Sequence, residues 1–336
     1  MNPPRERPRA RRCVPLTSLA TGRTLGLIGE SGAGKSTIGL AALGYFRAGL
    51  RPRAGQVLFE GRDLLSLPPA ELEALRRTRL AYVAQSAGAA FNPAHTLGQQ
   101  IAENLLRTGT AGQATARRRA EELVALLGLP EPRRFLDRFP HRVSGGQLQR
   151  AMTAMALCQE PRLIVFDEPT TALDVTTQAG VLLAIRDAIA ATGVSALYIS
   201  HDLPVVAQIA DEILVLRHGR AVEHGATGHI LSRPRADYTR RLVTAGRARS
   251  PRGPATARTP VLRAERIGMA YRQGTQVLDD VSLSLAASET LALVGQSGSG
   301  KTTLGRVITG LHPDAEGQPA IQPTGWLGTG PFCLRG

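Results

Sequence analysis

Two glycine-rich stretches, each closed by a lysine, carry the most definite chemistry in this sequence. The first reads GESGAGKS from Gly29 to Ser36, and the second reads GQSGSGKT from Gly295 to Thr302. Glycines let a backbone fold closely around an anion, and the N–H groups of the loop and of a following helix can bind phosphate oxygens. The lysine can reach the β- and γ-phosphates of a nucleotide, and the next hydroxyl can bind Mg²⁺. Both stretches therefore predict a site for a nucleoside triphosphate with Mg²⁺; the alternative is a glycine-rich turn before an ordinary helix.

The use of lysine supports the phosphate interpretation. The chain has 41 basic residues, of which only two, Lys35 and Lys301, are lysines. A phosphate loop accommodates a compact ammonium as a point charge. Flanking residues also match, Gly39 with Gly305 for example, which indicates an internal repeat. The residues expected to contact nucleotide are Gly29, Glu30, Ser31, Gly32, Ala33, Gly34, Lys35, Ser36 and Thr37 in the first copy and Gly295, Gly298, Gly300, Lys301, Thr302 and Thr303 in the second.

Two adjacent carboxylates follow an apolar run that is typical of a buried strand. Asp167 and Glu168 come directly after residues 163–166, which read LIVF. Open α/β sheets bind their ligands at the carboxyl ends of the strands. We expect Asp167 to hold Mg²⁺ through the water shell of the metal and Glu168 to polarise the attacking water as general base. The alternative is an exposed acidic turn.

His201 and Gln85 each follow another expected strand. His201 comes after the strand expected at 195–199, and Gln85 after the strand expected at 80–84. An amide at a strand end can contact metal and water together, so Gln85 joins Ser36, Asp167 and Thr302 as an expected metal contact. A catalytic role is the hypothesis for His201, and a structural histidine is the alternative.

A further glycine-rich start of a helix lies between these strands. Ser144, Gly145, Gly146 and Gln147 open a helix whose apolar face carries Leu148, Met152 and Met155. Ser144 can cap this helix, with Gln147 reaching back as in a capping box. The same helix start could bind an anion, which suggests a nucleotide shared between two domains. An ordinary helix cap is the alternative.

The alternation of apolar and helical segments predicts an α/β fold with a parallel sheet. Strands are expected at 56–59, 80–84, 163–166 and 195–199, with 212–216 as the last, and helices dominate from about 88 to 158. We expect residues 1–17 to be disordered, 18–245 to form a first domain, 246–260 a linker, 261–311 the start of a second domain with short strands at 261–285, and 312–336 an irregular tail.

Composition limits the other classes of function. The sequence contains no run of eighteen apolar residues, so it predicts no membrane span. The arginine-rich start lacks the apolar segment of a secretory signal. Three separated cysteines build neither a zinc site nor a disulfide framework, which favours a reducing compartment. The net charge of +14 could indicate nucleic acid or an anionic membrane surface, but the arginines are scattered, which favours the alternative that a GC-rich coding sequence produced them.

Taken together, these motifs resemble the complete set of an ATP-binding cassette ATPase. The resemblance covers residues 18–245 and resumes from 261 to about 311. It implies a P-loop NTPase fold, that is, a RecA-like parallel sheet with helices on both faces, a small antiparallel β subdomain and an inserted α-helical signature subdomain. It also implies that Gln85 couples to membrane subunits, that Asp174 lies at a dimer interface, and that Ser144 and Gly146 hold the nucleotide of the opposite protomer. Val143 stands where the signature usually has leucine.

A finer resemblance concerns the cargo. Residues 91–101 and the Tyr238–Thr239 region are similar to peptide/nickel-type importers, some of which fuse two ATPase halves in one chain. This implies membrane permease subunits and an extracytoplasmic solute-binding protein as partners, a homodimer or heterodimer of ATPase domains, and a cytoplasmic position at the inner face of the membrane.

The aromatic residue that stacks on adenine in the family is matched by Tyr271 in the second copy, whereas Arg5 occupies that position in the first. The second copy also lacks the motifs that follow the loop. The leading hypothesis is an importer ATPase; the alternatives are a truncated or frame-shifted product that binds nucleotide without productive transport, and a soluble tandem ATPase acting on nucleic acid.

Overall fold

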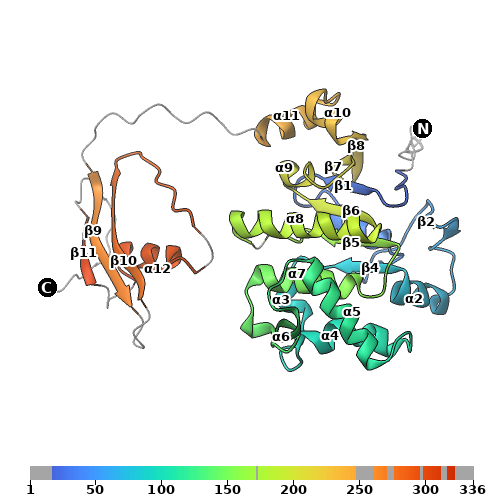
Figure 1. Cartoon of the computed structure of the whole chain (residues 1–336). Coiled ribbons are helices and arrows are strands. Elements are labelled where there is room, and N and C mark those ends of the chain that lie inside the picture. The colour runs from blue at the N-terminus through green and yellow to red at the C-terminus, as the bar shows by residue number, and fades with distance from the viewer. Residues whose placement is uncertain are drawn as a thin grey trace, which may run out of the picture. The chain divides into compact units, whose positions relative to one another are not determined.

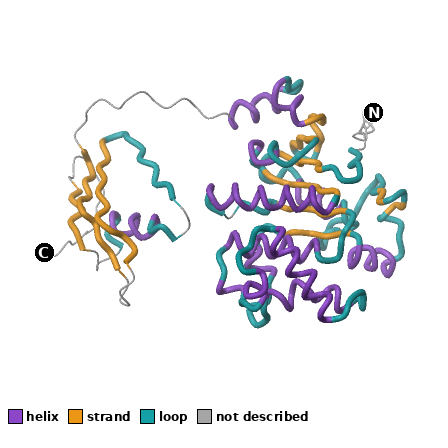
Figure 2. Tube along the Cα trace, viewed as in Figure 1, coloured by secondary structure: helices purple, strands orange, loops and turns teal. Residues whose placement is uncertain are grey.

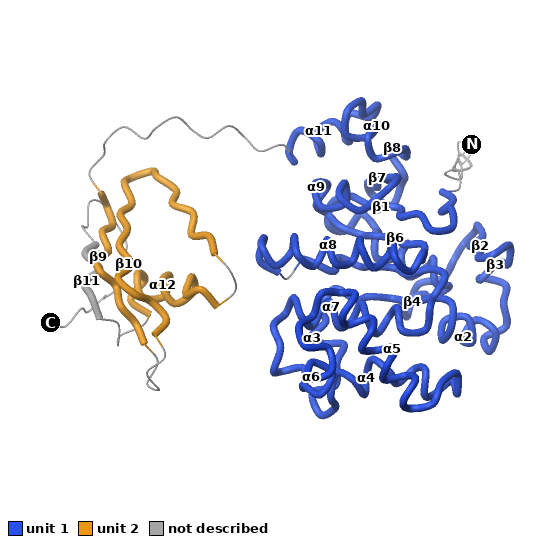
Figure 3. The backbone as a smooth tube through the Cα atoms, viewed as in Figure 1, with its two compact units in different colours: residues 1–248 blue, residues 249–336 orange. Residues whose placement is uncertain are grey.

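A computed structural model of the chain describes two units, residues 1–248 and 249–336 (Figure 3). The described residues are 17–171, 173–246, 260–270, 276–295 and 298–311, with the backbone of 316–321. Residues 1–16 of the expected disordered start, most of the linker, Arg5 and Tyr271 lie outside these ranges.

The first unit is built on a six-stranded sheet with the order β4-β5-β6-β1-β7-β8 (Figure 1). Its strands are β1 (Thr24–Ile28), β4 (Leu80–Val83), β5 (Leu163–Asp167), β6 (Ser195–Ser200), β7 (Glu212–Arg217) and β8 (Arg220–Ala226). β8 is antiparallel to β7, and the other neighbouring strands are parallel. The predicted α/β fold is confirmed; the expectation that the sheet ends with residues 212–216 is wrong, because a tight turn at Gly219 returns the chain as β8.

Both faces of the sheet are covered, which explains why its strands are apolar without alternation. Ile164 and Phe166 of β5 pack in a cluster with residues of α7 (Gly145–Leu157), α8 (Val175–Thr192) and α9 (Leu203–Val206). Val165 points to the other face and joins a cluster that includes α1 (Lys35–Ala41) and α2 (Pro69–Thr78). The purple helices of Figure 2 thus lie on both sides of the orange sheet.

Helices occupy the expected signature region. They are α3 (Ala87–Ala90), α4 (Leu97–Arg107), α5 (Gln113–Leu126), α6 (Pro132–Leu136) and α7, with a 3-10 turn at Pro140–Arg142. The antiparallel subdomain of this unit is a two-stranded ribbon of β2 (Leu58–Phe59) and β3 (Arg62–Asp63). After the sheet, α10 (Thr227–Ser232) and α11 (Asp237–Gly246) complete the unit.

The second unit is small. β9 (Pro260–Ala270) pairs with β10 (Gln276–Ala286) on one side and β11 (Glu316–Ile321) on the other, and α12 (Lys301–Ile308) packs on this sheet. The strands are longer than we predicted. The expectation of an irregular tail is wrong for residues 316–321, since an edge strand tolerates a proline such as Pro319.

The two copies of the repeat differ just before their glycine loops. Residues 25–28 form the buried strand β1, whereas Leu291, Leu293 and Val294 are exposed and form no strand. β1 is flanked by β6 and β7, and the described part of the second unit offers residues 291–294 no such neighbours. None of the described helices is long and apolar enough to cross a membrane.

Candidate nucleotide site

The first glycine loop connects β1 to α1 at the carboxyl edge of the sheet. Gly32 and Gly34 adopt left-handed φ values of 79° and 96°, which favour glycine, and Gly34 is the N-cap of α1. The loop is held from outside, since the N–H of Gly219 in the β7–β8 turn donates to the carbonyl of Ala33 at 3.0 Å. The predicted order of strand, glycine loop and helix is therefore confirmed here, and the N-terminus of α1, whose first N–H groups can bind an anion, lies at the end of the loop.

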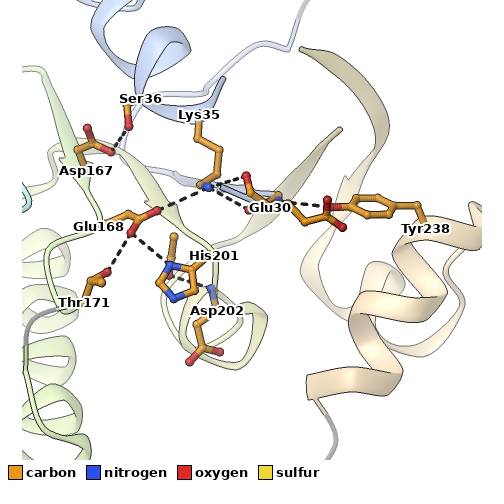
Figure 4. Close-up of polar contacts among 11 residues, drawn as sticks. Glu30, Lys35, Ser36, Asp167, Glu168, Thr171, His201, Asp202 and Tyr238 are labelled. Carbon is orange, nitrogen blue, oxygen red and sulfur yellow. Dashed lines mark hydrogen bonds and ion pairs between the residues drawn. The ribbon is translucent and has the colours of Figure 1, made fainter. Parts of the chain in front are cut away.

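Lys35 begins α1 and turns back over the loop. Its side chain is only 5% exposed, and Nζ donates to the carbonyls of Gly29 at 2.9 Å and Glu30 at 3.1 Å (Figure 4). Nζ also lies 3.6 Å from Oε1 of Glu168. The loop thus keeps a positive charge beside a carboxylate.

Asp167, at the end of β5, is 5% exposed and accepts two side-chain hydrogen bonds. Oδ1 accepts from Ser36 Oγ at 2.9 Å, and Oδ2 accepts from the hydroxyl of Tyr82 at 2.8 Å. Burial, and then this bond, raise the pKa of Tyr82 above its ordinary value. Hydroxyl and carboxylate oxygens are ligands that Mg²⁺ prefers, so Ser36 and Asp167 together fit this ion.

Glu168 follows with its backbone in the left-handed region, at φ 50°. Its Oε2 accepts from Thr171 Oγ1 at 3.0 Å and lies 3.2 Å from Nδ1 of His201 (Figure 4). β5 and β6 are neighbours in the sheet, so the residues that follow them meet at one edge. A carboxylate, an imidazole and a lysine within reach of one another can polarise a water molecule beside a bound phosphate.

The remaining predicted residues lie elsewhere. Gln85 is exposed just after β4. Ser144 and Gln147 form a capping box at the start of α7: Gln147 N donates to Ser144 Oγ at 3.3 Å, and Ser144 N donates to Gln147 Oε1 at 3.1 Å. Gly145 and Gly146 are the first residues of α7, and Asp174 caps α8 by accepting from the N–H of Thr177. These contacts are local, so a nucleotide role for them stays a prediction.

The second loop resembles the first in its local geometry. Lys301 Nζ donates to the carbonyl of Gly295 at 2.7 Å, and Gly300 is the N-cap of α12 with φ 86°. Gly298 also has a positive φ, and Thr302 and Thr303 follow in the first turn of α12.

Three contacts escaped prediction from the sequence. Tyr82 donates a hydrogen bond to Asp167, and Thr171 donates one to Glu168. The hydroxyl of Tyr238 in α11 accepts a hydrogen bond from the N–H of Glu30 at 3.3 Å. Arg217 lies 4.9 Å from the centre of the Tyr238 ring, and burial raises the pKa of Tyr238. For the contact between Tyr82 and Asp167, the signal in the sequence was Tyr82 itself, a tyrosine three residues before Gln85 in the expected strand.

The chain is similar to known proteins. A family profile described as "ABC transporter" matches residues 16–171 and 278–327. The chain is 37% identical to the peptidoglycan transport ATP-binding protein YejF of Agrobacterium fabrum, over 87% of this chain and 56% of that protein. It is 36% identical to the glutathione import ATP-binding protein GsiA of Pectobacterium atrosepticum, over 89% of this chain and 55% of that protein. The chain thus spans a little over half the length of these relatives.

A solved structure gives the same fold. It is a dimeric ATP-binding cassette in a post-hydrolysis state, bound to ADP and phosphate, with 26% sequence identity and a TM-score of 0.55. The similarity covers 63% of this chain and 88% of that chain.

Proposed function

The chain belongs to the ABC transporter family, and we propose that it binds and hydrolyses ATP to drive an importer. One observation carries the proposal: Lys35, Asp167, Glu168 and His201 come together from three different strand ends at the edge of one parallel sheet. The glycine loop and α1 supply backbone donors for the triphosphate at the same edge.

Each side chain has a role in this proposal. Lys35 leaves its loop carbonyls to bind the β- and γ-phosphates. Ser36 and Asp167 hold Mg²⁺, which neutralises charge on the phosphates when bound. Glu168 accepts a proton from the attacking water, and His201 orients that carboxylate through the contact with Oε2. Gln85, just after β4, would contact the metal and the attacking water.

Bound Mg²⁺ would need ligands from the nucleotide as well as from the protein. Within the described ranges, no group of three or more His, Cys, Asp or Glu side chains could hold a metal ion. Mg²⁺ usually keeps several waters and binds one or two protein groups plus substrate phosphates. Ser36 and Asp167 meet that requirement.

The proposed assembly is a dimer of ATPase domains on membrane permease subunits. Ser144, Gly145, Gly146 and Gln147 at the start of α7 would contact the nucleotide of the opposite domain, with Asp174 beside them. A solute-binding protein outside the membrane would deliver the cargo, and this chain would lie on the cytoplasmic face. By analogy with relatives named for peptidoglycan, oligopeptide and glutathione transport, the cargo is a peptide or a related small solute such as nickel.

Two substitutions in the first loop site, with a matched control in the second, test the proposal. Lys35→Ala should abolish most nucleotide binding in the first unit, while Glu168→Gln should keep binding and lose hydrolysis. Lys301→Ala should leave both properties of the first unit unchanged. Binding is measured with a fluorescent ATP analogue, and hydrolysis by phosphate release with the membrane partners present. Unchanged affinity in Lys35→Ala would overturn the proposal.

A further inference from the structure

We propose that Tyr82 is a positioning residue that sets which oxygen of Asp167 faces the magnesium ion. The inference rests on the proposed function and adds a residue to it. Asp167 has two oxygens, and each is held by a different side chain: Oδ1 by Ser36 at 2.9 Å and Oδ2 by Tyr82 at 2.8 Å.

The two donors are not equivalent. Ser36 is itself a metal-binding candidate and lies at the start of α1, directly after the glycine loop. Tyr82 lies on β4, on the other side of the carboxylate, and its hydroxyl is engaged with Oδ2. A carboxylate turns readily about its terminal torsion, which has broad and roughly two-fold preferences. A donor fixed to Oδ2 therefore keeps Oδ1 turned toward Ser36 and the metal.

The backbone holds Tyr82 firmly enough for this role. β4 pairs in parallel with β5, with Tyr82 opposite Val165, and the ring extends along β5 to Asp167. The ladder between the two strands thus fixes both donor and acceptor. Because the phenol is neutral, it holds the carboxylate without cancelling the charge that attracts Mg²⁺.

Partners of this kind commonly account for a factor of about 10 to 100 in metal affinity. A phenylalanine would occupy the same place in β4 but could not donate. We therefore expect Tyr82→Phe to weaken the magnesium-dependent part of nucleotide binding about tenfold. Binding without metal depends on the loop and Lys35, so it should not change.

The experiment uses the full chain and a fluorescent ATP analogue, titrated once with excess Mg²⁺ and once with EDTA. The variants are Tyr82→Phe and, as a matched control, Tyr45→Phe, a residue that is 48% exposed and whose ring lies beside Arg76. The expected result is that the ratio of the two affinities falls about tenfold in Tyr82→Phe and stays at the wild-type value in Tyr45→Phe. Replacing Mg²⁺ by Mn²⁺ adds a second measure, because the electron paramagnetic resonance spectrum of bound Mn²⁺ reports its ligands.

Two results would overturn the inference alone. One is an unchanged affinity ratio in Tyr82→Phe, and the other is an equal loss of affinity with Mg²⁺ and with EDTA, which would indicate general damage. A wild-type chain whose affinity is the same with Mg²⁺ and EDTA would instead overturn the magnesium site in the proposed function.

Discussion

Glu168 brings together a cation, an imidazole and a hydroxyl on one carboxylate. Oε1 lies 3.6 Å from Lys35 Nζ, while Oε2 is shared by His201 and Thr171. Its backbone N–H donates to the carbonyl of Ile199 at 3.0 Å, which ties the residue to β6. A left-handed conformation in a residue other than glycine costs about 1–3 kcal/mol, and it persists only where surrounding contacts impose it. The position of Glu168 is therefore set by several contacts rather than by its own preference.

The Thr171 hydroxyl should contribute to hydrolysis through that carboxylate. Thr171→Val removes the donor to Oε2 but keeps the shape of the side chain, so kcat should fall about tenfold, because hydrogen bonds to charged groups are worth about 1.5–3 kcal/mol. Nucleotide affinity should not change. Thr78→Val serves as control, since Thr78 Oγ1 donates to the Ala74 carbonyl in α2. A drop in affinity with kcat unchanged would contradict the assignment.

At the scale of elements, the parallel sheet brings the residues of the site together at one edge. β6 lies between β5 and β1, and the residues that follow these three strands carry the loop, the carboxylates and His201. This much could be predicted from the sequence, because an apolar run followed directly by charged residues indicates a strand end. The glycine loop likewise determines its own conformation through residues such as Gly34.

Contacts between distant elements could not be predicted. The bond between Tyr82 and Asp167 depends on β4 lying beside β5, which no local pattern encodes. The contact of Tyr238 with Glu30 requires β8, α10 and α11, none of which was expected. Residues 291–294 show the same limit. They match residues of β1 in sequence, yet they form no strand, because strand formation depends on neighbours such as those that flank β1.

Two helices begin with the same type of cap, so substitutions in the two caps can distinguish an effect on stability from an effect on function. Thr96 with Gln99 at α4, and Ser144 with Gln147 at α7, each form a capping box. Thr96→Ala and Ser144→Ala should each lower the free energy of unfolding by about 1 kcal/mol, measured by urea titration.

Only Ser144→Ala should also lower ATP hydrolysis in the assembled transporter, because only Ser144 is proposed to contact a nucleotide. Equal ATP hydrolysis in Thr96→Ala and Ser144→Ala would show that Ser144 acts only as a helix cap.

At the scale of the whole molecule, the two units differ in how much they bury. In the first, two large clusters of apolar residues cover both faces of the sheet. The fully or nearly fully buried apolar residues of the second are few among those described: Ala264, Ile267, Leu278, Leu304 and Val307. A small core supports a correspondingly small stability.

Hydrogen exchange should reveal this difference. Amides of β9 and β10 should exchange at least about 100 times faster than those of β1, β5 and β6, because local opening costs less where fewer apolar contacts are lost. Mass spectrometry of the full chain after timed exposure to heavy water would measure it. Similar protection in the two units would show that the second has stabilising contacts beyond its own core.

The burial of Lys35 has a practical consequence for work at the bench. A protease specific for lysine has only two places to cut this chain, and Lys35 is almost inaccessible at the start of α1. Cleavage there would require the first turn of that helix to open, so the rate of this single cut would report how often the phosphate loop unfolds. ATP that holds the loop closed should slow the cut, which makes the unmodified protein its own probe for ligands.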